Sequence, residues 1–285
     1  MQPGTPPRAG WHFRRWRRRG LPVWAVAVLV GVFVCAAFAE WVSPAAPARQ
    51  DLRATLALPS TAHPLGTDPL GRDVLARVIF GSRISMLVGL ASVGVAGCLG
   101  VALGLLSVVL PGWAGDAIMR LADMTLSLPA VLIALAVAAT VGPSLLNVIL
   151  IIGLLYWANF ARMVRGEALS VLQRDFLAAA RAIGCSPPRL LLRHVLPNVV
   201  NTMIVIASLQ LAAAIILEST LSFLGVGVPP PTPTWGTMVA EGRPYLASAW
   251  WIVTFPGLAI MLTVLAINVL GDWIRDRLDP RLRRL

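Results

Sequence analysis

The chain alternates between long apolar stretches and short polar segments rich in proline, glycine and arginine. Six stretches are apolar over about 20 residues each, the length that carries a helix across the hydrocarbon core of a bilayer. Backbone groups inside lipid must bond to one another, so a spanning segment of this kind is helical. The pattern predicts an all-α membrane protein with six transmembrane helices, at 21–42, 84–110, 118–141, 145–163, 199–217 and 250–270.

The first stretch shares features with a secretory signal peptide. Ala37, Phe38 and Ala39 imitate the small-residue pattern of a cleavage site. The apolar run before them is longer than the core of a signal peptide, which has about 7–15 residues. We therefore expect an uncleaved helix over 21–42.

The composition is also that of a membrane protein. Of the 285 residues, 57% are hydrophobic and 13% are charged, whereas about a quarter of the residues in soluble domains are charged. All 24 basic residues are arginine. The lack of lysine excludes an ordinary P-loop ATPase, whose lysine contacts the phosphates. It also excludes Schiff-base chemistry, which needs a lysine amine.

The arginines are distributed unevenly between the two sides of the predicted membrane. Six spans place both termini on one side, and the segments on that side hold eighteen of the 24 arginines. Cytoplasmic segments are enriched in basic residues, so both termini are predicted to be cytoplasmic. The arginine-rich segment 14–19 fits this topological signal. A nucleic-acid-binding arm is the alternative, disfavoured because an apolar span follows directly.

The segment 174–198, between the fourth and fifth predicted spans, is polar and is predicted to begin with a short helix. Asp175 is placed to cap this helix, and Gly184 to end it with a left-handed residue. Arg181 lies in the last turn, where a cation suits the helix dipole. The apolar positions of the helix recur on one face, and they are Phe176, Ala179, Ala180 and Ile183.

A second helix is predicted directly after the turn. Ser186 and Pro187 are typical of a helix cap and first helical residue, and Pro197 is predicted to end the helix. A helix–turn–helix of this kind stands outside the bilayer between two spans. We expect it to dock on a partner.

This segment is similar to the EAA loop of ABC importer permeases. That loop has the pattern EAA, three residues, Gly, nine residues, a hydrophobic residue, any residue, and Leu-Pro. Two positions depart from it, because Ala178 replaces the Glu and His194 fills the hydrophobic position. The matching residues are Ala179, Ala180, Gly184, Leu196 and Pro197. The sequence RHVLPN at 193–198 resembles the dipeptide, oligopeptide and nickel branch of the family.

Three further segments resemble the same branch. They are 63–85, 221–236 and 268–283, so the resemblance extends over 63–283. In the first of them, Gly66 and Gly71 are expected at turns, and a helix is expected to begin near Asp73. We expect a structured element there rather than a plain connection.

The resemblance implies a permease subunit with the type I ABC importer fold, in a bacterial inner membrane. Implied partners are a homologous second permease, two cytoplasmic ATPase subunits and an extracytoplasmic binding protein. No cofactor or nucleic acid is implied. The expected organisation is a basic cytoplasmic tail (1–20), a first helix (21–42), a periplasmic loop (43–77), a core permease domain (78–272) containing the coupling loop (166–198), and a cytoplasmic tail (273–285).

By this resemblance the coupling loop contacts the ATPases. The residues to which it assigns this role are Ala178, Ala179, Ala180, Arg181, Gly184, Arg189, His194 and Pro197.

Few polar residues lie within the predicted spans. Arg120 and Asp123 are spaced to pair with one another. Glu218 is a candidate for the translocation path, since an intramembrane carboxylate is functional by default; solvation near the outer interface is the alternative. Gln210 and Asn159 are further candidates for the path.

Other chemistry is disfavoured. The three histidines, His12, His63 and His194, are too far apart in the chain to form one metal site. A membrane enzyme would need a catalytic pair at matched depth, and a secondary transporter usually has repeated broken helices. Neither pattern is present.

The substrate is less determined than the class of transporter. A path for bare nickel would gain from clustered imidazole or sulfur ligands, but the predicted spans contain no histidine and their methionines are scattered. This favours short peptides. Nickel or another small solute is the alternative.

Overall fold

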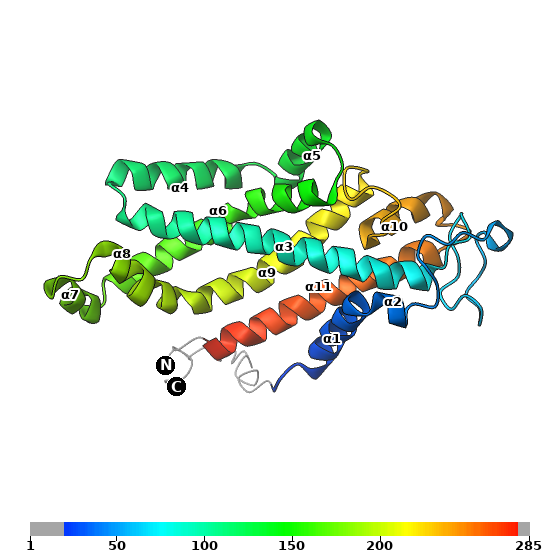
Figure 1. Cartoon of the computed structure of the whole chain (residues 1–285), viewed down its shortest axis with the longest axis horizontal. Helices are drawn as coiled ribbons and strands as arrows, with labels where there is room; N and C mark the ends of the chain where they lie inside the picture. Colours follow the sequence, from blue (N-terminus) through cyan, green and yellow to red (C-terminus); the bar gives the residue numbers. More distant parts are fainter. Residues whose placement is uncertain (1–19, 279–285) are drawn as a thin grey trace, which may run out of the picture.

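The computed structural model describes residues 20–278, and most of them are helical (Figure 1). Most of the basic N-terminal tail and part of the C-terminal tail lie outside these residues. The helices are α1 (Val23–Ala37), α2 (Ala39–Val42), α3 (Val74–Val109), α4 (Gly112–Ser127), α5 (Ala130–Val141), α6 (Leu145–Leu172), α7 (Asp175–Ala182), α8 (Pro187–Leu190), α9 (Leu196–Phe223), α10 (Trp235–Gly242) and α11 (Trp251–Leu278). Shorter turns are η2 (Leu52–Ala54), the π-helical η3 (Leu191–Val195) and η4 (Arg243–Tyr245).

Four helical segments in the described part are long and apolar enough to cross a membrane: α3, α6, α11 and the continuous run from α8 to α9. The shorter α1 is also apolar. The predicted span 118–141 is wrong as a single helix, because α4 and α5 meet at 92°. The break is at Leu128 and Pro129. Proline lacks the N–H of a helix interior and forces the preceding residue to be extended, and Leu128 has ψ 144°.

Helices α3 and α6 pack along one another more extensively than any other pair. Gly100 and Gly104 permit this approach, since a Cβ at Gly100 would lie 2.4 Å from the carbonyl oxygen of Trp157. At Gly104 a Cβ would lie 2.8 Å from the carbonyl oxygen of Ala161. Lipid tails are as apolar as leucine, so close backbone contact, not the hydrophobic effect, holds such helices together.

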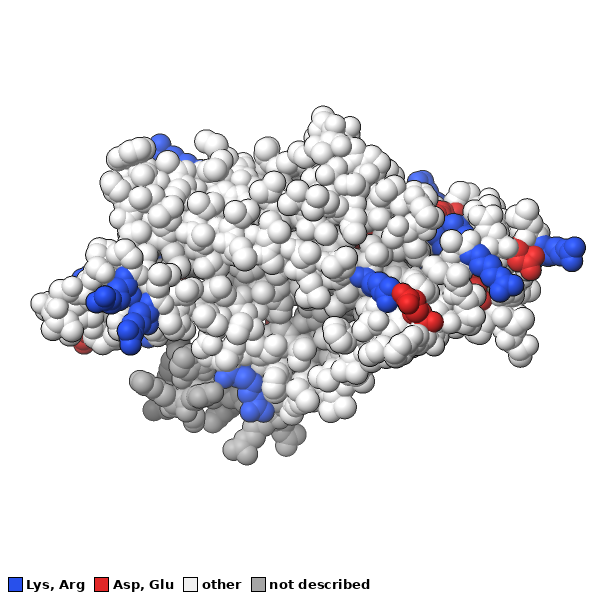
Figure 2. All heavy atoms as spheres, in the orientation of Figure 1, with Lys and Arg blue, Asp and Glu red and all other residues white. Residues whose placement is uncertain are grey.

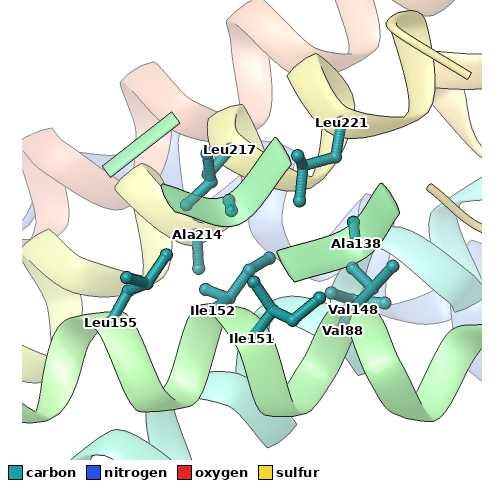
Figure 3. Packing of buried hydrophobic residues seen from close by; sticks show 10 residues of the cluster. Val88, Ala138, Val148, Ile151, Ile152, Leu155, Ala214, Leu217 and Leu221 are labelled. Atoms are coloured by element: carbon teal, nitrogen blue, oxygen red, sulfur yellow. The ribbon is translucent and has the colours of Figure 1, made fainter. Parts of the chain in front are cut away.

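The largest buried cluster lies between α6 and α9 (Figure 3). Ile152 and Leu155 of α6 face Ala214 and Leu217 of α9, and Ala138 of α5 closes one side of the cluster. Through this cluster α5 is held against the long helices.

Opposite α7 and α8, at the other end of the molecule, the loop 43–73 folds against the helices (Figure 1). Both predicted turns are confirmed, with φ of 76° at Gly66 and 69° at Gly71. Asp73 caps α3 as expected, accepting a hydrogen bond from the backbone N–H of Ala76 at 2.8 Å. His63 Nδ1 lies 2.9 Å from Asp73 Oδ2. This loop is therefore a structured element.

A buried ion cluster locks that end. Asp68 and Glu241 each pair with both Arg72 and Arg77. Asp68 and Arg77 are almost fully buried, and unpaired charges there would be costly. The cluster joins the loop, the start of α3 and α10. Figure 2 shows that charged side chains on one face lie mainly toward the two ends of the molecule.

Candidate coupling element and translocation surface

The turn between α7 and α8 has the geometry that the sequence predicts. Gly184 has φ 84°. Its N–H donates to the carbonyl of Arg181 at 3.0 Å, and the N–H of Cys185 donates to the carbonyl of Ala180 at 3.1 Å. These two bonds form a Schellman motif, which satisfies the last carbonyls of a helix. Glycine suits the position because it has no Cβ to clash in the left-handed conformation.

The start of α7 differs from the prediction. Asp175 is the first helical residue, and Arg174 occupies the cap position without a side-chain hydrogen bond. The carboxylate of Asp175 therefore acts through its charge in the first turn. Ser186 does occupy the cap position of α8, followed by Pro187, but its hydroxyl makes no capping bond.

The prediction that Pro197 ends the second helix is wrong. Helix α8 continues through the π-helical turn η3 into α9, and Pro197 lies in the first turn of α9. In a π-turn the hydrogen bonds run over five residues instead of four. A proline has no N–H to donate to the carbonyl four residues before it. It can follow a π-turn because the regular hydrogen-bond pattern is already interrupted there.

One side of the coupling element, defined here as residues 175–195, is anchored in the membrane helices. Leu177 and Val195 are fully buried. They pack with Leu105 of α3 and with Val164 and Ala168 of α6 in a single apolar cluster. Other members are Val171, Leu190, Leu191 and Val199. The element is therefore attached to three helices at once.

The other side of the element is apolar but has no partner in the described chain. Ile183 is 87% exposed, Leu192 65% and Phe176 46%. The predicted apolar face of α7 thus points mostly outward, and of its members only Ala180 is partly buried. Exposed apolar side chains concentrated on a polar loop are typical of a protein-binding surface.

Glu218 is fully buried in α9, which contradicts the alternative that it is solvated. Its carboxylate accepts hydrogen bonds from Ser222 Oγ at 2.8 Å and from Ser219 Oγ at 3.4 Å. The hydroxyls of Ser85 on α3 and Thr234 before α10 also face it. The loop after α9 folds back to cover this cluster, which ties α3, α9 and α10 together.

The three path candidates lie on two helices, Glu218 and Gln210 on α9 and Asn159 on α6. No hydrogen bond joins Glu218, Gln210 and Asn159 to one another within residues 20–278. The Nε2 of Gln210 is buried without a hydrogen-bond partner, and Asn159 is half-buried on α6.

Charged residues of α4 pair with α6 instead of with one another. Asp123 pairs with Arg162, not with Arg120 as predicted. Asp116 lies 3.1 Å from Arg165, whose other guanidinium nitrogen donates to the carbonyl of Gly115. Asp123, Arg162 and Asp116 are exposed, whereas Arg165 is partly buried. They hold α4 against α6 in the half of the molecule that carries the coupling element (Figure 1).

A cavity of about 530 Å³ lies between α4, α5 and α6. Its lining is apolar except for Thr125 and Asn147. Across the part of the chain that the structure describes, no three His, Cys, Asp or Glu side chains meet as a metal site requires. The cavity suits an organic solute better than a bare cation.

Comparison with known proteins identifies the chain. Residues 96–284 match the family of binding-protein-dependent transport system inner membrane components. The chain belongs to this family. It is a multi-pass inner-membrane permease, as the resemblance of its motifs implied.

Named relatives cover nearly all of the permease. It is 45% identical over 88% of its length to the di/tripeptide transport system permease protein DppC of Pseudomonas aeruginosa, and covers 85% of that protein. It is 42% identical to the dipeptide transport system permease protein DppC of Escherichia coli, and the match covers 99% of this chain and 95% of that protein. It is also 42% identical to the probable D,D-dipeptide transport system permease protein DdpC of Escherichia coli, with 93% and 90% covered.

A solved structure has the same fold. The MetNI methionine ABC transporter, in inward-facing conformations, aligns with a TM-score of 0.60 at 16% identity, covering 71% of this chain and 96% of that one. The predicted all-α type I importer permease fold is confirmed. It includes the broken pair α4–α5 and the helices long enough to cross the bilayer.

The permease gathers its predicted coupling residues in one place. Six are exposed on the element or just after it: Ala178, Ala179, Arg181, Gly184, Arg189 and Pro197. Ala180 and His194 are partly buried. Position 178, where Ala replaces the Glu of the EAA pattern, is exposed.

The residues that anchor the element were not predicted. Leu177 lies between the exposed positions Phe176 and Ala178, so helical periodicity alone gave it no special weight. Arg162 and Arg165 were counted only as a topological signal. Arg162 and Arg165 are three residues apart on α6, and Asp116 and Asp123 are seven residues apart on α4. Each set lies on one face of its helix, and this was the available sign of ion pairs between the two helices.

Proposed function

We propose that the permease is one subunit of an ATP-driven importer of short peptides and forms half of its translocation path. The observation that supports this most directly is the coupling element, a rigid unit with a buried apolar anchor and an exposed apolar surface. The family supplies the transport class, and the names of the relatives favour peptides over nickel or another small solute.

The proposed assembly has this chain beside a homologous second permease, with two ATPase subunits on the cytoplasmic side and a binding protein outside. The exposed side of the coupling element, with Phe176, Ile183 and Leu192, docks on an ATPase. The buried side transmits its displacement to α3, α6 and α9. Packed helices respond to such displacement by discrete shifts of position. ATP hydrolysis is thereby converted into alternating access of the path.

In this proposal both termini and the coupling element are cytoplasmic. The arginine distribution supports that orientation. The ion cluster around Asp68 and Arg77 then lies at the outer surface, where the binding protein delivers the substrate.

Uptake in cells lacking and regaining this gene tests the proposal. We expect loss of the gene to abolish sensitivity to a toxic dipeptide, and we expect the gene on a plasmid to restore this sensitivity. Nickel accumulation should be unchanged in both strains. A control plasmid carries Gly184→Val, which should be inserted in the membrane but should not restore sensitivity. Unchanged dipeptide sensitivity combined with lost nickel accumulation would contradict the assignment.

A further inference from the structure

Glu218 is a buried acid with no basic residue beside it. Its side chain is completely buried, and it forms no ion pair with any residue of 20–278. The groups that face its carboxylate are four hydroxyls, from Ser85, Ser219, Ser222 and Thr234. A buried charge is costly unless it is paired, and hydroxyls supply dipoles but no opposite charge. An ionised Glu218 is therefore not balanced by a cation of the described chain.

The hydroxyl of Ser85 is the second unusual group in this cluster. Ser85 is completely buried on α3 and faces the carboxylate. Its Oγ nevertheless makes no hydrogen bond of normal geometry within the described residues, although buried polar side chains in proteins are nearly always hydrogen-bonded. A hydroxyl has two lone pairs besides its proton, so this oxygen is able to coordinate a cation. The pattern is that of two ligands of one cation.

The oxygen atoms come from three segments of the chain. Ser85 lies on α3, Glu218, Ser219 and Ser222 lie on α9, and Thr234 directly precedes α10. Together they present two carboxylate oxygens and four hydroxyl oxygens, and oxygen ligands select hard cations. A single carboxylate balances one positive charge, so the set suits a monovalent cation. A richer set of ligands for a divalent metal is not found, because no three His, Cys, Asp or Glu side chains meet in the described part of the chain.

The cluster is compact and lies beside a second, smaller cavity. Glu218 Oε1 lies 2.8 Å from Ser222 Oγ, and Oε2 lies 3.4 Å from Ser219 Oγ. Ligand oxygens as close as these favour a small cation such as sodium over potassium. Ser222 also lines the cavity, which has a volume of about 230 Å³ and extends to Glu241 of the ion cluster. It gives a hydrated cation access to the carboxylate from the end of the molecule that carries the ion cluster.

We propose that Glu218, Ser85, Ser219, Ser222 and Thr234 form a sodium-binding site. Sodium neutralises the buried carboxylate and is coordinated by the hydroxyl oxygen of Ser85, which otherwise makes no hydrogen bond. A bound cation joins α3, α9 and the segment before α10, and so stabilises the folded loop that covers the cluster. This site goes beyond the proposed function, since it holds for any transported solute.

Sodium binding to the complete purified importer tests this site. The melting temperature and the binding of radioactive sodium are measured as sodium chloride replaces choline chloride at constant ionic strength, with potassium chloride in a parallel series. Glu218→Gln removes the charge, and Ser85→Ala removes only the hydroxyl that makes no hydrogen bond. Ser107→Ala is the matched control. Ser107 is also buried on α3, but its hydroxyl donates to the carbonyl of Gly104.

We expect sodium to raise the melting temperature of wild type and of Ser107→Ala by about 5 °C and in a saturable manner, because a ligand that binds only the folded state stabilises it. Glu218→Gln should lose this rise and the corresponding bound sodium. Ser85→Ala should melt close to wild type in choline chloride, but should need about tenfold more sodium for the same rise, as expected for a weakened ligand set.

An equal sodium response in wild type, Glu218→Gln and Ser85→Ala would overturn the site, because the salt would then act elsewhere. So would the absence of a sodium response in wild type, or an equal rise with potassium. A wild-type melting temperature that rises on acidification but not with sodium would show that a proton neutralises Glu218 instead. If Glu218→Gln does not assemble, the comparison of Ser85→Ala with Ser107→Ala decides. Failure of the peptide-uptake test would leave all of these outcomes unchanged.

Discussion

Replacing Gly184 by valine tests whether the turn of the coupling element transmits force. No neighbouring atom lies within 4 Å of a Cβ placed at this position, so the added Cβ meets no other part of the chain. Its cost is the left-handed backbone, φ 84°, which is about 1–2 kcal/mol for a residue with a Cβ. If the turn opens instead, the two Schellman bonds are lost, at about 0.5–1.5 kcal/mol each. The strain alone shifts the balance from the observed turn toward an open one by roughly 5- to 30-fold relative to wild type, while the bonds lost on opening oppose that shift.

Two matched variants separate this effect from others. Asparagine tolerates the left-handed conformation, so Gly184→Asn should keep the turn. Gly94, on α3, is also exposed with no atom within 4 Å of a built Cβ, but it has no positive φ. Gly94→Val therefore adds the same side chain without backbone strain.

The measurement is peptide-stimulated ATP hydrolysis by the complete complex in proteoliposomes, with its subunit composition checked on a gel. We expect Gly184→Val to lower stimulation about tenfold, following the shift in turn population, while Gly184→Asn and Gly94→Val stay within about twofold. Normal stimulation in Gly184→Val would refute the role of the turn. Equal losses in the valine and asparagine variants would show that side-chain size matters there instead.

Two further outcomes follow from the fold. Glu218→Ala should lower the melting temperature of the purified complex, because a buried hydroxyl left without its acceptor costs about 1–3 kcal/mol. Glu218→Gln keeps an acceptor oxygen and should lower the melting temperature much less. Equal melting temperatures of the two variants would contradict a structural role of the carboxylate. Single cysteines at positions 5 and 280, on a background lacking Cys35, Cys98 and Cys185, should react with an impermeant thiol reagent only from the cytoplasmic side, and labelling from outside would reverse the proposed orientation.

Features governed by local chemistry could be predicted from the sequence. The left-handed Gly184 needs only the few residues around it, and so does the cap at Asp73, whose side chain bonds within one turn. The spans are equally local, since twenty apolar residues leave few choices in lipid. Gly184, Asp73 and four of the six predicted spans agree with the structure, whereas the third span is broken between α4 and α5.

Features that depend on distant segments could not be predicted in the same way. Glu218 is buried because the loop after α9 folds back over it, with Gly227 and Gly236 lying against Ser222 and Ser219 so closely that a Cβ would clash. The partner of Asp123 is Arg162, which lies on α6. The chain reaches α6 only after the bend between α4 and α5. The hydropathy averaged over 118–141 predicts one span where the structure has α4 and α5. Pro129, a proline within an apolar run, was the signal of the break.

The coupling element carries two opposite apolar surfaces on very short helices, an arrangement that supports its proposed role as a lever. Ile183 is 87% exposed, yet Leu177, less than two turns before it, is completely buried against α3 and α6. Any protein that holds Ile183 therefore also holds Leu177 through a rigid backbone. Close-packed clusters do not stretch, so movement of α7 must carry its neighbours or break the cluster. Val195 in the same cluster leads directly into α9, so in the proposed mechanism a displacement of the element passes through helical backbone to the helix that bears Glu218.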